Sequence, residues 1–90
     1  MMTPAETQAL IDQLKEERNR LDQQLDDALH TFAEYEEGMN VRWQTADANG
    51  RQDLMAERSR VEEELGIVTI VLRLDEIREA LDAAEASRLG

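Results

Sequence analysis

His30 is the only histidine of the chain, and an imidazole is a common metal ligand. Asp27 lies three residues before it, and Glu34 and Glu37 follow. A carboxylate three residues before a histidine is the spacing that ferritin-like proteins use to place metal ligands on a bundle helix. Such a site also needs glutamates on facing helices, and with 21 acidic residues an aspartate near His30 is expected by chance. A metal-binding, ferritin-like oligomer is therefore a minor alternative, and we expect no metal or other cofactor.

Residues used in nucleophilic or acid–base catalysis are few or poorly placed. The chain has no cysteine, and Ser59 and Ser87 have no histidine near them in the sequence. It also lacks a Gly-x-Ser-x-Gly elbow and a glycine-rich phosphate loop. The run Glu62-Glu63-Glu64 is typical of a solvated helix face. We predict no catalytic or cofactor-binding residue and no enzymatic activity.

The charge of the chain argues against two classes of partner. Acidic residues number 21 and basic residues 10, which gives a net charge of −11. Nucleic-acid backbones and anionic membranes attract cationic proteins, so direct nucleic-acid binding is not expected. The longest apolar stretch, 67–72, is far shorter than the ~20 residues of a membrane-spanning helix, and residues 1–13 resemble no secretory signal. The sequence predicts no membrane insertion and a cytoplasmic protein, or a virion component assembled in the cytoplasm.

The first half of the chain has the pattern of a long amphipathic helix. Thr3 is a suitable N-cap, Pro4 occupies the first helical position, and Glu6 completes a capping box. Apolar residues then recur with the 3–4 spacing of a coiled coil, interrupted by Arg18. The positions in this seam are Ile11, Leu14, Leu21, Leu25, Ala28, Phe32, Tyr35 and Met39.

A turn is expected in the middle of the chain. Gly38 is one candidate, but Asn49-Gly50 is the stronger turn signal, and Asn49 with Gln52 has the spacing of a second capping box. A turn there also places the two most apolar segments opposite each other. We therefore predict a single domain, 1–90, that forms a long antiparallel helical hairpin. Its parts are a helix over about 4–46, a turn over about 47–50 and a helix over about 51–88.

Two apolar seams overlap in the second predicted helix, between Leu65 and Leu74. In a helix this segment is apolar on nearly all sides, and such a helix must be buried on all sides. One neighbouring helix is not enough, so we predict an all-α fold in which coiled-coil-like hairpins associate into a four-helix or larger bundle. The predicted oligomer interface comprises Leu25, Leu29, Phe32, Leu65, Ile67, Val68, Ile70, Val71, Leu72 and Leu74.

Two other structures fit parts of the same sequence. Residues 67–71 are β-branched and follow Gly66, which favours a short strand after a helix end. Alternatively, one seam continues through Gly50, which would give a single helix of most of the chain in a parallel oligomer. The helical patterns on both sides of residues 67–71 favour one continuous second helix.

Trp43 lies close to the predicted turn, where it has two interpretations. Tryptophan is enriched at the centre of protein interfaces, so Trp43 is a possible partner anchor. It also suits a plug at the end of the bundle, beside Met39, Leu54 and Met55.

Taken together, the sequence predicts a non-enzymatic structural or assembly module that acts as a self-associating helical hairpin. Its partners would be itself, as a homo-oligomer, and another protein, for example in a virion or a complex of which it is a small subunit. The alternative is an acidic inhibitor or decoy that occupies a basic, nucleic-acid-binding groove of a target protein.

Overall fold

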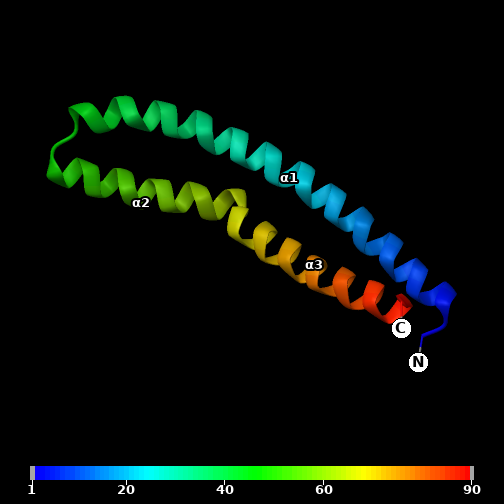
Figure 1. The fold of residues 1–90 in the computed structure, drawn as a ribbon. Coiled ribbons are helices and arrows are strands. Elements are labelled where there is room, and N and C mark those ends of the chain that lie inside the picture. Colours follow the sequence, from blue (N-terminus) through cyan, green and yellow to red (C-terminus); the bar gives the residue numbers. More distant parts are fainter. Residues whose placement is uncertain (1, 90) are drawn as a thin grey trace.

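A computed structural model describes residues 2–89, and this part of the chain forms three helices and no strand. They are α1 (Pro4–Thr45), α2 (Ala48–Leu65) and α3 (Ile67–Leu89). α2 and α3, here called the return arm, run back beside α1, and the end of α3 lies next to the start of α1 (Figure 1). The molecule is elongated, with extents of 62 × 18 × 17 Å. The predicted all-helical fold is confirmed.

α1 begins with the hydrogen bonds that its sequence predicts. The Thr3 hydroxyl oxygen accepts a hydrogen bond from the Glu6 backbone N–H at 3.1 Å, and the same hydroxyl lies 3.1 Å from the Glu6 carboxylate. Pro4 takes the first helical position, where its missing N–H has no consequence. The helix then continues through Gly38 to Thr45, so the turn does not occur at Gly38.

The turn lies two residues earlier than predicted. Ala46 and Asp47 connect the helices, and α2 already begins at Ala48. The Asp47 carboxylate accepts a hydrogen bond from the Gly50 N–H at 2.7 Å, so Asp47 is the N-cap. The predicted capping role of Asn49 is wrong, because an aspartate caps as well as an asparagine and Asp47 comes first in the chain.

The second predicted helix, 51–88, is interrupted at Gly66. The backbone of this glycine lies in the left-handed helical region, with φ 70° and ψ 23°. Its N–H donates to the Glu63 carbonyl at 3.0 Å, and its carbonyl accepts from the Ile70 N–H at 2.9 Å. Gly66 therefore ends α2 and begins α3 without leaving either of these groups unpaired. The predicted continuity through 66 is wrong, and so are the strand at 67–71 and the single helix through Gly50.

The break at Gly66 explains the two overlapping seams. In α2, Leu54 is buried against α1, and Val61 and Leu65 of the same seam are half-buried. A continuous helix would bring Val68 and Leu72 onto this face next, but both are more than half exposed. In α3 the seam of Ile77, Leu81 and Ala84 packs inward instead and is buried with Ile11 and Leu14. The left-handed residue thus changes which side of the return arm faces α1.

The tightest packing is found towards the two ends of the molecule. Ile11 and Ile77 are fully buried where the chain ends meet, together with Leu14, Leu81 and Ala84. Phe32, Met39 and Leu54 are buried nearer the turn. Between these clusters no residue of the segment 65–74 is fully buried, so α1 covers the apolar middle of the return arm only in part.

Candidate interaction surface

Four large apolar side chains in the middle of the molecule are exposed to solvent. The exposed fractions are 47% for Leu29, 58% for Val68, 40% for Val71 and 57% for Leu72. We call these four residues the apolar patch. They come from α1 and the first turns of α3, close to the break at Gly66. Single exposed apolar residues are common on protein surfaces, but several in the same part of the molecule are a candidate interaction surface.

The ten residues predicted for the oligomer interface have different surroundings in the single chain. Phe32 is buried within the chain, with the Arg58 guanidinium 5.2 Å from its ring centroid. Leu25, Leu65, Ile67, Ile70 and Leu74 are half-buried, and the remaining four form the apolar patch. Nine of the ten thus have surface left for another chain, and the interface itself stays a prediction.

Ion pairs identify the sides of the molecule on which the patch lies. Arg73 donates two hydrogen bonds of 2.7 Å to the Glu17 carboxylate and pairs α3 with α1 on one flank. Val71 is two residues, or about 200°, from Arg73 and lies on the opposite flank. In α1, Glu17 and Leu29 occupy the two heptad positions on opposite sides of the seam. Leu29 and Val71 therefore share one flank, while Val68 and Leu72 face away from α1.

The Glu17–Arg73 contact is also the strongest electrostatic link between α1 and α3. The hydrogen bonds from Arg73 lower the pKa of Glu17, and they raise the pKa of the arginine in turn. Glu76 of α3 also contacts Arg73, at 3.0 Å. Because both charges of the main pair remain partly exposed, it positions the helices more than it stabilises them.

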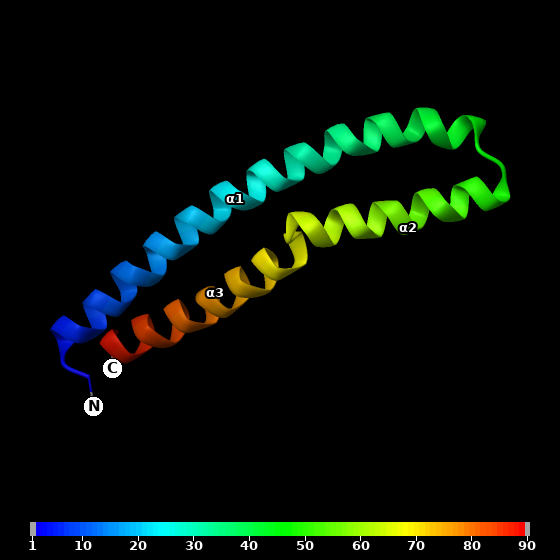
Figure 2. The ribbon, with the colours of Figure 1, turned by 180° about the vertical axis from the view of Figure 1, so that it is seen from behind.

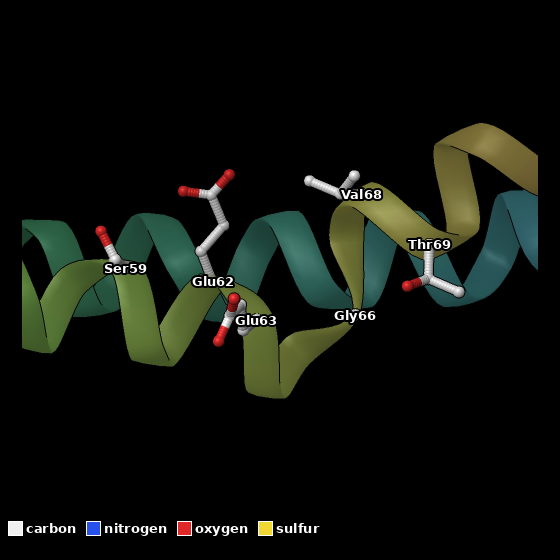
Figure 3. Close-up of a pocket in the computed structure, with 6 residues that line it drawn as sticks. All are labelled: Ser59, Glu62, Glu63, Gly66, Val68 and Thr69. Atoms are coloured by element: carbon white, nitrogen blue, oxygen red, sulfur yellow. The ribbon is translucent and has the colours of Figure 1, made fainter.

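A groove lies on the outer side of the return arm at the break. It has a volume of about 400 Å³ and is lined by Ser59, Glu62, Glu63, Gly66, Val68 and Thr69. Figure 3 shows Glu62 and Val68 pointing to the same side of the arm, with α1 behind. We call this the kink groove. One of its walls carries carboxylates and the other begins the apolar patch.

The end of the molecule near the turn is held by arginines. Arg42 donates two hydrogen bonds to Glu57, at 3.3 and 2.9 Å, which raises the pKa of Arg42 and lowers that of Glu57. Tyr35 is next to this pair, and burial raises its pKa first, with the nearby Glu57 charge adding to the effect. Its hydroxyl is buried without a hydrogen bond of normal geometry.

Trp43 is half-buried at this end and is covered by Arg51. The guanidinium lies 5.0 Å from the Trp43 ring centroid, and its Nε donates to the Trp43 carbonyl at 3.2 Å. The stacked guanidinium covers part of the Trp43 ring at the turn end of the molecule. The predicted role of Trp43 as a partner anchor stays a prediction.

The residues considered for chemistry are dispersed and exposed. His30 lies 3.2 Å from Glu34, and both side chains are largely in solvent. Asp27 accepts a hydrogen bond from Gln23 instead. Within residues 2–89, no three residues with metal-binding side chains are grouped around a common point. In the same range, every helix is too short or too polar to cross a membrane.

Comparison of the chain with protein-family models, with curated protein sequences and with solved structures found no match. The interaction surface therefore has to be interpreted from its own geometry. Val68 and Leu72 are exposed on this surface because Gly66 has a left-handed backbone conformation. Hydrophobic periodicity alone does not reveal that conformation. The signal in the sequence that could have located the break is the overlap of two seams between Leu65 and Leu74, a segment that contains Gly66.

Proposed function

We propose that this chain is a non-enzymatic assembly module, a helical hairpin that associates with copies of itself into a four-helix or larger bundle. The observation that carries the proposal is the partly covered segment 65–74, in which no residue is fully buried by the chain itself. A helix that is apolar on several sides requires neighbours on several sides, and α1 supplies only one.

The flank with Leu29 and Val71 is the surface that we assign to self-association. Two hairpins that lie flank to flank bring four helices together, which is the arrangement of a four-helix bundle. A two-fold axis would place Leu29 and Val71 of each copy in the same contact, together with the half-buried Leu25 and Ile67. Burial of these side chains from water is the favourable term.

The net charge of −11 works against association and gives the proposal a recognisable salt dependence. Two copies repel each other through their exposed carboxylates, and salt screens this repulsion over about 10 Å at 0.1 M. Self-association through an apolar surface should therefore strengthen as salt is added. A contact that depended on ion pairs between copies would weaken instead.

A pair of matched substitutions tests the flank. We expect Val71→Glu to shift the chain to the monomer in size-exclusion chromatography with light scattering, because it places a charge in the apolar contact. Val41→Glu is the control, since Val41 is 68% exposed on α1 outside the patch. It should leave the measured mass unchanged. Equal association of both variants would contradict the assignment of the flank.

A further inference from the structure

We propose that the kink groove and the outer side of α3 bind a basic amphipathic helix of another protein. This inference goes beyond self-association and uses a different surface. The flank carries Leu29 and Val71, whereas the groove and the outer side carry Val68 and Leu72.

The shape of the outer side suits a helical partner. The molecule is bowed, with α1 on the convex side and the return arm on the concave side (Figures 1 and 2). The kink groove, about 400 Å³, lies where α2 and α3 meet on this concave side. An amphipathic helix docks its apolar face on exposed apolar side chains, which Val68 in the groove and Leu72 beside it supply.

The order of residues along the outer side defines the chemistry of the partner. Val68, Leu72, Asp75 and Glu79 follow one another at intervals of four, three and four, so they form one stripe along α3, the outer stripe. All four are exposed. On the other side of Val68 and Leu72, towards α2, Glu62 and Glu63 line the kink groove. Two apolar residues are therefore bordered by carboxylates in both directions.

A helix that complements this arrangement has an apolar centre and Lys or Arg residues on both sides of it. Its apolar residues would cover Val68 and Leu72, and its cations would approach Glu63 at one end and Glu79 at the other. These ends are at most about 24 Å apart along the helices, so roughly four turns of partner helix span them. A second copy is the poorer occupant, because it would bring further carboxylates to an acidic border.

The test uses a synthetic amphipathic helix of leucine and lysine as the probe, with its leucine–glutamate counterpart as the peptide control. Isothermal titration calorimetry measures its affinity for the full chain. We expect the basic peptide to bind and the acidic one not to bind. Binding should weaken as salt is added, which is the opposite of the salt effect expected for self-association.

Matched variants separate the proposed site from general attraction to an acidic protein. Leu72→Ser and the double variant Glu62→Gln/Glu63→Gln should each weaken binding about tenfold. Val41→Ser and Glu34→Gln/Glu37→Gln remove the same groups from exposed positions on α1, and they should bind as the natural chain does. Equal affinity in all variants, or absence of binding, would overturn the proposal.

Light scattering of the same Leu72→Ser variant distinguishes this inference from the proposed function. If this variant still associates but binds the peptide about tenfold more weakly, the two surfaces are separate, as we infer. If the natural chain associates but never binds the peptide, the proposed assembly function is supported and the proposed peptide site is contradicted.

Discussion

Gly66 has a left-handed backbone conformation, so replacing it with alanine should destabilise the chain. The same replacement at Gly38 is the control. A Cβ added at Gly66 would meet no atom within 4 Å, and the same holds for Gly38. The two positions differ in the backbone, since Gly38 lies within the helix α1 whereas Gly66 has φ 70°. Alanine is favoured over glycine in a helix by about 0.5–1 kcal/mol, but in the left-handed region it costs roughly 1–2 kcal/mol.

Gly38→Ala should therefore stabilise the chain and Gly66→Ala should destabilise it. The two variants should differ by about 2 kcal/mol in the free energy of unfolding, or roughly 10 °C in melting temperature for a domain of this size. Thermal unfolding followed by far-UV circular dichroism measures this, at one protein concentration because association adds stability. If both variants were stabilised equally, Gly66 would be helical and the break between α2 and α3 would not exist.

Three further predictions concern the core, an ion pair and a cap. Ile77→Ala removes a fully buried side chain and should lower the free energy of unfolding by about 3 kcal/mol in urea titrations, whereas Val41→Ala should change it by less than about 0.5 kcal/mol. Glu17→Gln should lower the melting temperature at neutral pH more than Glu16→Gln does. Arg73 holds the pKa of Glu17 below its ordinary value, so this stabilisation is present at neutral pH and is lost as the pH falls through that lowered pKa; a difference that stayed constant down to acid pH would contradict the role of the pair. Asp47→Ala should cost about 1 kcal/mol through loss of the cap on Gly50, and an unchanged unfolding midpoint would show that this cap is not formed.

Local signals in the sequence were sufficient to predict α1. The Thr3 cap, the Pro4 start and the heptad seam up to Met39 all act within a few residues, and the structure has each of them. The turn was displaced because Asp47 and Asn49 offer the same capping chemistry two residues apart. Sequence alone does not decide between two caps when both are compatible with the helix that follows.

The break at Gly66 depends on contacts between helices that are far apart in the sequence. Two seams overlap around this residue, but the choice between a continuous helix and a left-handed break is made by packing against α1. Ile77 is fully buried only when the α3 seam faces Ile11. The Glu17–Arg73 pair was not predicted for a similar reason, since 21 acidic residues offer many partners to each arginine until the register is known.

Trp43 shows that the type of a residue leaves more than one role open. Its enrichment at interfaces made it a possible anchor, but Arg51 covers its ring in the single chain. The exposed aliphatic residues Val68 and Leu72 lie elsewhere, on the first turns of α3. These are displaced outward by the change of seam, which a residue-by-residue reading of interface preference does not reveal.

The mass of the unmodified chain in solution tests the central claim most directly. Sedimentation equilibrium across micromolar concentrations should give at least twice the chain mass of 10.3 kDa, with tighter association at higher salt. A single species of 10.3 kDa over that whole range, at low and at high salt, would show that the flank with Leu29 and Val71 remains uncovered and would contradict the proposed assembly.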